Sequence, residues 1–246
     1  MNKDRIYEIK SLLTEGAKII KTQGIMHAFF AFLRLVNMNV EGYYYYLRYI
    51  FHSQIFSRKG SINPFITVEV DPKMIESSIS HEIQRWGDIG KVIDGDWDQR
   101  STPLSDLIKY RSLIDHFENE TPWEKTDVYQ EAVDHIESGE TYWNGCKSIE
   151  DLDKRVEAVE DLYESMRKHG YVSQEARYGD AYKDIVLSRK FDRSKEEIAV
   201  AISRSNELLF VDGNHRLAIS HVLSLDIITV HVIAAHPKSF HNRKDN

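Results

Sequence analysis

The sequence predicts an α+β protein in which a small mixed sheet carries helices on its faces. Segments 65–70 and 198–202 alternate with the two-residue period of a strand. Segments 126–138 and 148–169 repeat apolar residues with the period of a helix. The last third of the chain runs strand, turn, strand, helix and strand, so both kinds of element share one region.

The composition excludes several classes of protein. The chain has 246 residues with 41% apolar and 29% charged residues, which is ordinary for a soluble globular protein. Cys146 is the only cysteine, so an internal disulfide is excluded and a reducing, cytoplasmic compartment is predicted. No apolar run approaches the roughly 18 residues that indicate a membrane span.

Charge is distributed unevenly along the chain. Residues 1–60 hold nine Lys/Arg and four acids, a net charge of +5, so the remainder carries −12 of the total of −7. An acidic body argues against nucleic-acid binding, which needs a basic face. The basic N-terminal segment is instead expected to face something anionic.

The first 60 residues are predicted to form a basic, aromatic appendage of two or three helices. Apolar residues have helical spacing over 4–22, 26–36 is strongly apolar, and 43–51 is rich in tyrosine. Aromatic and basic side chains together suit an interface, so one interpretation is a membrane-peripheral protein on an anionic surface, or a contact with a protein partner. The alternative is that these helices pack on the protein's own body.

Residues 61–240 are predicted to form the main domain, which opens with the strand 65–70. Asp71 and Pro72 supply the N-cap and the first-turn proline of a helix. This helix is predicted from one apolar face, formed by Ile75, Ile79, Ile83 and Trp86.

An irregular acidic stretch follows. Asp94, Asp96 and Asp98 alternate with glycine and tryptophan, and oxygen-rich loops of this type hold Mg²⁺ or Ca²⁺. The glycine and distal glutamate of a calcium loop are missing, so Asp96 and Asp98 are predicted as magnesium ligands. The alternative is a solvated acidic turn.

Three helices are predicted between residues 102 and 170. Each begins at a capping residue: 102–120 at Thr102, 126–138 at Thr126, and a third at Ser148, which forms a capping box with Asp151.

The clearest pattern lies in the C-terminal third. Strands 198–202 and 208–211 flank a hairpin turn, a helix begins after Asp212-Gly213-Asn214, and 228–233 forms a final strand. A helix that starts directly after such a turn presents backbone amides at its N-terminus, and His215 and Arg216 lie beside them. The pattern predicts a phosphate site.

These turns, taken in order, resemble the ParB/sulfiredoxin superfamily. The resemblance rests on Gly-Tyr-Val-Ser-Gln at 170–174, on 198–200, and on the Asp-Gly-x-His-Arg motif within 210–218. It covers about 150–236, with 65–86 as a first strand and helix. It implies a ParB/sulfiredoxin-like core with a mainly helical insertion at about 87–149, nearest the ParB-like free serine kinase branch.

The resemblance also implies nucleotide chemistry at the turn, with ATP, ADP or CTP and Mg²⁺ as ligands. The implied nucleotide-binding residues are Gln174, Gly213, Asn214, His215 and Arg216. Arg216 and His215 would contact phosphates, and Asp212 would accept a proton from an acceptor hydroxyl or bind Mg²⁺, so these three are the implied catalytic residues. Each has a structural alternative: His215 as a packing residue, Arg216 paired with an acid, and Asp212 ending the strand.

Two departures from the superfamily narrow the expected function. Asn214 stands where sulfiredoxin has its catalytic cysteine, and only ten residues follow His236, where ParB continues into a DNA-binding module. The leading expectation is a nucleotide-dependent phosphotransferase or nucleotide hydrolase with a small or lipid-linked acceptor. The alternatives are a non-catalytic ParB-like module that binds nucleotide or a partner and, disfavoured by the acidic body, a ParB-like nuclease.

Overall fold

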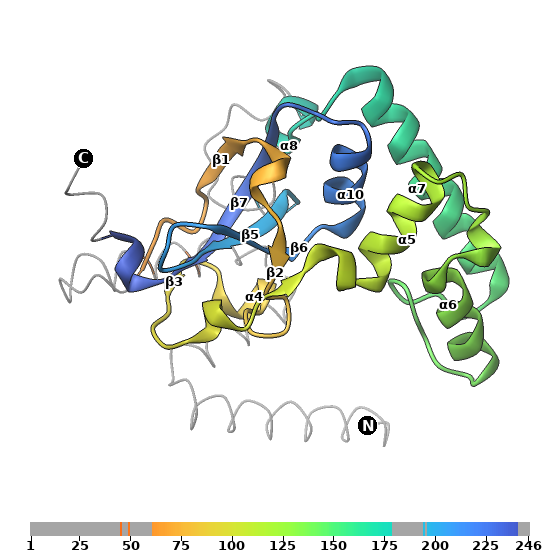
Figure 1. Ribbon diagram of the computed structural model, residues 1–246, viewed down its shortest axis with the longest axis horizontal. Coiled ribbons are helices and arrows are strands. Elements are labelled where there is room, and N and C mark those ends of the chain that lie inside the picture. The colour runs from red at the N-terminus through yellow and green to blue at the C-terminus, as the bar shows by residue number, and fades with distance from the viewer. Residues whose placement is uncertain (1–44, 46–48, 50–60, 179–193, 195, 241–246) are drawn as a thin grey trace, which may run out of the picture.

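The computed structural model describes Tyr45, Tyr49, residues 61–178, Ser194 and residues 196–240. Over these residues the chain forms a seven-stranded mixed sheet with helices packed against it (Figure 1). The mixed α and β architecture predicted from the sequence is confirmed. The strand order is β1-β7-β5-β6-β2-β4, and β3 pairs with β7 beside this path.

The longest strands lie side by side at the centre of the sheet. The strands are β1 (Thr67–Val70), β2 (Ser77–Ser78), β3 (Lys91–Val92), β4 (Thr102–Pro103), β5 (Ile198–Ile202), β6 (Leu208–Asp212) and β7 (Ile228–Ala235). β7 is antiparallel to β1 and parallel to β3 and β5. β5 and β6 are antiparallel, and β2 is parallel to β6 and antiparallel to β4.

The β5–β6 hairpin forms as predicted. Its turn closes where Ser203 N donates to Glu207 O at 3.0 Å. Ala199 faces a cluster on one side of the sheet and Val200 a cluster on the other, and both residues are fully buried. The strand is therefore covered on both faces, which explains its continuous apolar sequence.

The helices of the described residues are α4 (Arg85–Asp88), α5 (Ile108–Phe117), α6 (Asp127–Glu137), α7 (Ile149–His169), α8 (Gln174–Tyr178) and α10 (Asn214–Val222). Single turns of 3₁₀ helix are η2 (Pro72–Met74), η3 (Trp97–Gln99), η4 (Leu104–Asp106), η5 (Trp123–Lys125) and η7 (Pro237–Phe240).

Helix α7 begins and ends as the sequence predicts. Ser148 Oγ accepts from Asp151 N at 3.1 Å, and Asp151 Oδ2 accepts from Lys147 N at 3.0 Å. The helix ends at Gly170, whose φ of 70° favours glycine. The predicted helix 126–138 is confirmed as α6, with Thr126 at the N-cap.

The prediction of a helix after Asp71-Pro72 is wrong, because a 3₁₀ turn and then a strand follow these residues. Asp71 does cap a turn, because its Oδ1 accepts from Lys73 N at 2.9 Å, but the turn is only η2 and the chain is extended again by Ile75. Strand β2 follows, between β4 and β6. The apolar spacing has another cause: Ile75 packs on one face of the sheet, and Ile79 and Ile83 pack on the other.

The predicted start of the helix 102–120 is also wrong. Thr102 is the register partner of Ser78 in β4, so it belongs to the sheet and does not cap a helix. The turn η4 follows, and α5 begins at Ile108. Pairing with β2 accounts for the extended conformation at Thr102.

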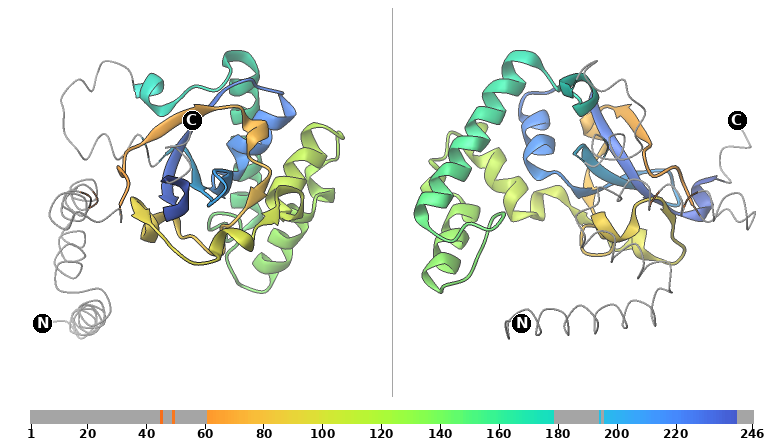
Figure 2. Two further views of the ribbon diagram at one scale, coloured as in Figure 1. Left: turned by 60° about the vertical axis from the view of Figure 1, so that its left-hand side comes forward. Right: turned by 180° about the vertical axis from the view of Figure 1, so that it is seen from behind.

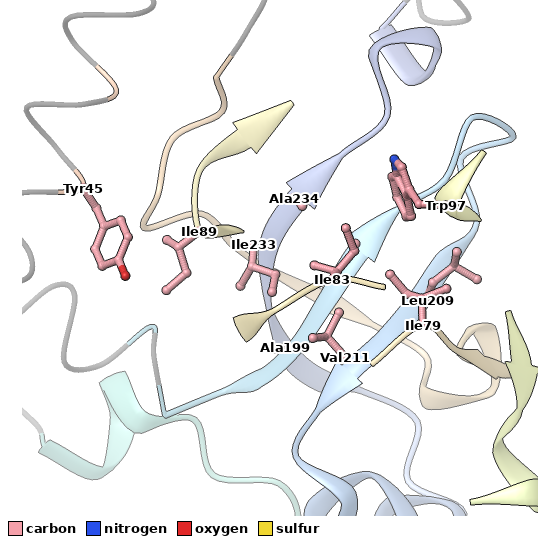
Figure 3. Packing of buried hydrophobic residues seen from close by; sticks show 11 residues of the cluster. Tyr45, Ile79, Ile83, Ile89, Trp97, Ala199, Leu209, Val211, Ile233 and Ala234 are labelled. Atoms are coloured by element: carbon pink, nitrogen blue, oxygen red, sulfur yellow. The ribbon is translucent and has the colours of Figure 1, made fainter. Parts of the chain in front are cut away.

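The helices stack in layers on one face of the sheet. Leu217 of α10 packs on that face with Val200, Phe210 and Val230, while Ala218 belongs to a second buried cluster that contains side chains of α5, α6 and α7. Figure 2 shows α10 between the sheet and these three helices. On the opposite face, side chains from the segment before β3 and from η3 cover β5, β6 and β7 (Figure 3).

Segment 87–149, which was expected to be a mainly helical insertion, also contributes strands to the sheet. It supplies strands β3 and β4, and β3 pairs with the central strand β7. Helix α5 contacts α10 directly: the Tyr110 hydroxyl lies 2.6 Å from His221 Nδ1. The segment therefore helps to hold the helix that carries the predicted site.

The predicted appendage, residues 1–60, lies outside the described residues except for Tyr45 and Tyr49. Tyr45 is 7% exposed, packs in the cluster of Figure 3, and its hydroxyl donates to the backbone carbonyl of Trp86. Within the described part of the chain, no helix combines the length and the apolar character that crossing a membrane requires.

Candidate functional site

The turn between β6 and α10 places the predicted site at one edge of the sheet. Strand β6 ends at Asp212, Gly213 has φ 108° and ψ 35°, and α10 begins at Asn214. A Cβ at position 213 would lie 3.1 Å from Ile198 Cα, so glycine is needed for its backbone conformation and for the close approach to β5. No side chain caps α10, so its first backbone N–H groups have no capping partner.

Asp212 is held in place from two sides. Its Oδ2 accepts from Arg85 Nη1 at 2.6 Å, and its Oδ1 accepts from Gly213 N at 2.7 Å. Arg85 Nη2 also donates to the carbonyl of Glu197 at 3.0 Å, so this guanidinium joins the end of β6 to the residue before β5. The Asp212 side chain remains 48% exposed beside the start of α10.

A buried carboxylate, Glu197, lies behind the turn. Its side chain is 2% exposed. It accepts from the Tyr171 hydroxyl and from Gln174 N, both at 2.6 Å, and from Arg216 Nη1 at 3.4 Å. Burial raises the pKa of Glu197, and these hydrogen bonds and the positive charge offset that effect only in part.

Gln174 and Arg216 are therefore brought together, but around Glu197. Gln174 contributes its backbone N–H. Arg216 also donates to the Tyr171 hydroxyl at 3.3 Å and to the carbonyl of Glu196. The structure thus shows the alternative interpretation of Arg216, in which it pairs with an acid of the body.

His215 is a neutral residue at the start of α10. Burial is the largest cause that lowers the pKa of His215, the charges of Arg155 and Lys109 act in the same direction and Asp212 opposes them, and the resulting pKa is about 4. The Trp143 indole donates to His215 Nε2 at 3.0 Å, so the imidazole proton resides on Nδ1. His215 can therefore donate a hydrogen bond at neutral pH, but it carries no charge.

Two cations from other helices surround His215. Lys109 on α5 and Arg155 on α7 both lie near enough to lower the pKa of the imidazole. Arg155 Nε is buried and has no hydrogen-bond partner in the described structure. Together with Arg216 of α10 itself, these residues bring positive charge from three helices near the first turn of α10. The chain as a whole carries a net charge of −7.

Asp96 and Asp98 lie at the other end of the β5–β6 hairpin. Arg204 lies in the hairpin turn, and its Nη2 donates to Asp96 Oδ1 at 2.7 Å and to Asp98 Oδ1 at 2.8 Å. The backbone N–H of Arg204 donates to Asp98 Oδ2 at 2.7 Å. Burial raises the pKa of Asp98, but the hydrogen bonds and charge of Arg204 outweigh it, so the net effect is a lowered pKa. These carboxylates are occupied by an arginine.

The structure does not bring Asp212 together with Asp96 and Asp98, because the two places lie at opposite ends of β6. Four residue steps at about 3.3 Å each separate these ends by roughly 13 Å. In the part of the chain that the structure describes, no group of three or more His, Cys, Asp or Glu side chains is placed to hold a metal ion.

Several residues at this edge escaped the sequence analysis, namely Arg85, Lys109, Trp143, Arg155 and Glu197. For Glu197 a signal was present: the predicted hairpin pairs the start of β5 with the end of β6, and the structure has Ala199 opposite Asp212. The others come from helices whose packing no local pattern specifies.

The chain was compared with protein-family models, with curated proteins and with solved structures, and none of the three gives a match. A function for the β6–α10 turn is therefore inferred from its geometry.

Proposed function

We propose that the protein is a nucleotide-dependent phosphotransferase or nucleotide hydrolase of the ParB/sulfiredoxin-like kind, with the phosphates bound at the Asp212–Arg216 turn. The observation that carries the proposal is the positive environment of an uncapped helix start. Lys109 and Arg155 both lie near enough to lower the pKa of His215, and Arg155 Nε is buried without a hydrogen-bond partner among the described residues. Backbone amides and fixed cations together are what a phosphate requires.

Each residue of the turn has a role in this proposal. The backbone amides of Asn214, His215 and Arg216 and the Nδ1 proton of His215 donate to phosphate oxygens, with Lys109 and Arg155 neutralising charge. Arg216 acts mainly as a nearby charge, because its hydrogen bonds go to Glu197, Tyr171 and Glu196.

Asp212 is the proposed base. Its carboxylate is half exposed and is oriented by Arg85 at 2.6 Å. In phosphoryl transfer it takes the proton of an acceptor hydroxyl while the hydroxyl oxygen bonds to phosphorus and the bridging oxygen leaves with the nucleoside diphosphate. With water in place of the acceptor, the same arrangement hydrolyses the nucleotide. The proposed acceptor is a small or lipid-linked molecule.

Mg²⁺ would enter with the nucleotide. Magnesium sites at phosphates commonly use only one or two carboxylates, with phosphate oxygens and waters as the other ligands. Asp212 is the candidate ligand because it lies at the turn itself, whereas Asp96 and Asp98 lie at the other end of the hairpin, beside Arg204. When bound, the ion neutralises charge on the phosphates.

The proposal is tested by calorimetric titration with ATP, ADP, CTP and inorganic tripolyphosphate in the presence of Mg²⁺. Replacing Arg155 by Gln should weaken binding about 10- to 100-fold, since a hydrogen bond to a charged group contributes roughly 1.5–3 kcal/mol. Lys154→Gln is the matched control, because Lys154 precedes Arg155 on α7 and is 65% exposed in a pair with Glu150. Equal affinity of the two variants and the wild type would overturn the proposal.

A measurement of product formation distinguishes an enzyme from a non-catalytic binding module. If the protein is an enzyme, phosphate or phosphorylated acceptor appears with time, and Asp212→Asn keeps binding but stops product formation. The alternative is a non-catalytic module that binds nucleotide or a partner. It is favoured by the extensive pairing of Arg216, which leaves that guanidinium with little to offer a transition state. Nucleotide binding without product across many acceptors would select the module.

A further inference from the structure

Trp86 stands apart from the other tryptophans of the chain. The side chains of Trp97, Trp123 and Trp143 are at most 7% exposed, whereas Trp86 is 48% exposed. It lies on α4, in the residue next to Arg85, which holds Asp212. A half-exposed indole beside the candidate site offers a ligand an apolar, aromatic surface.

The Trp86 ring is close to the phosphate turn. The guanidinium carbon of Arg85 lies 5.3 Å from the Trp86 ring centroid, and the same guanidinium bonds Asp212 at 2.6 Å. With a C–N bond of about 1.3 Å, the ring centroid is within about 9 Å of the Asp212 carboxylate. A ligand whose phosphates lie on the turn can therefore reach Trp86 with its other end.

The backbone that carries Trp86 is held in place. Gln84 N donates to Asp88 Oδ2 at 2.8 Å, Asp88 N donates back to Gln84 O at 2.9 Å, and Lys91 Nζ bonds Asp88 Oδ1 at 2.8 Å. The Tyr45 hydroxyl donates to the carbonyl of Trp86 itself. The backbone at Trp86 therefore loses little conformational freedom when a ligand stacks on the indole.

We propose that Trp86 is the stacking surface for the base of a purine nucleotide whose phosphates bind at the Asp212–Arg216 turn. This inference rests on the proposed function. Every nucleobase has a flat π-face that an aromatic side chain can stack on, and the two-ring indole offers the largest contact to a two-ring base. Arg85 then serves both parts of the ligand site, since it contacts the ring and orients Asp212.

The test is calorimetry with Mg²⁺ and ATP, CTP or inorganic tripolyphosphate, on the wild type, Trp86→Ala and Trp86→Phe. Stacking contributes enough that Trp86→Ala should weaken ATP binding about 5- to 100-fold. Tripolyphosphate has no base, so its affinity should not change. Phe should restore most of the ATP affinity, and the wild type should bind ATP more tightly than CTP. Ile149→Ala, which truncates another exposed apolar side chain at the start of α7, should behave as the wild type.

The outcomes distinguish this inference from the function on which it rests. If the wild type binds ATP and tripolyphosphate and Trp86→Ala binds ATP equally well, the stacking role is refuted and the phosphate turn stands. If Trp86→Ala loses tripolyphosphate as much as ATP, stacking is also refuted, because the effect then acts through the turn. If the wild type binds neither ligand, the proposed function fails and the inference fails with it.

Discussion

Replacing Gly213 by Ala tests how the start of α10 is built. Gly213 has φ 108°, where an L-residue is strained by roughly 1–3 kcal/mol. A methyl group there would also lie 3.1 Å from Ile198 Cα and 3.3 Å from Ile198 Cγ1. A backbone atom of strand β5 cannot move aside cheaply, and overpacking of this kind costs about 1–3 kcal/mol more. We therefore expect Gly213→Ala to lower the free energy of unfolding by about 2–6 kcal/mol.

Gly95→Ala is the matched control. Gly95 has nearly the same φ, 101°, but nothing lies within 4 Å of the Cβ that alanine would add. It should therefore show the backbone strain alone, about 1–3 kcal/mol. The assay is urea unfolding followed by circular dichroism, with the difference between the two variants as the measured quantity. If the two variants lose the same stability, the close approach of Gly213 to Ile198 has no energetic weight and the reasoning is refuted.

Three further predictions concern ionisable groups. Arg204→Met should lower the free energy of unfolding by about 2–4 kcal/mol, because it leaves the buried Asp98 carboxylate with only a backbone donor. Asp96→Ala removes a side chain that is 72% exposed, so it should cost less than about 1 kcal/mol. Folding lowers the pKa of Asp98 below its ordinary value of 3.8. The contribution of Asp98 to stability should therefore be complete at neutral pH and be lost as the pH falls through the folded pKa. Asp98→Asn should remove this pH dependence in urea unfolding. The imidazole of His215, with a pKa of about 4, should show no NMR titration between roughly pH 5.5 and 8.

Each of these has a clear contrary result. Equal losses from Arg204→Met and Asp96→Ala would mean that the buried pair contributes no more than a surface pair. A wild type and Asp98→Asn with parallel acid unfolding would show that Asp98 is not stabilised by its ionised form. A His215 resonance that titrates near pH 6.5 would place the imidazole in water and not among Lys109, Arg155 and Trp143.

Local patterns determined where the sequence could be interpreted correctly. The hairpin β5–β6, the capping box of α7 and the turn at Gly213 each depend on residues that are neighbours in the chain, and each was confirmed. In these places propensity, capping and burial all favour one conformation.

Long-range pairing explains where the sequence analysis went wrong. Ile75, Ile79 and Ile83 have helical spacing, but β2 between them is stabilised by pairing with residues 210 and 102–103, which no local window contains. Thr102 was assigned to a helix cap for the same reason. In the candidate site, the motif Asp212–Arg216 was visible, whereas Arg85, Lys109 and Arg155 reach it only through tertiary packing.

The position of β7 in the sheet determines the order in which the fold can assemble. In the described structure, β1 pairs only with β7, and β3 joins the sheet through β7 as well. About 160 residues separate β1 from this partner, so both strands stay unpaired on a growing chain until residues 228–235 have left the ribosome. Pairing over such long sequence separations is slow. The sheet therefore closes late, and until then the edges of its N-terminal strands are exposed to other chains.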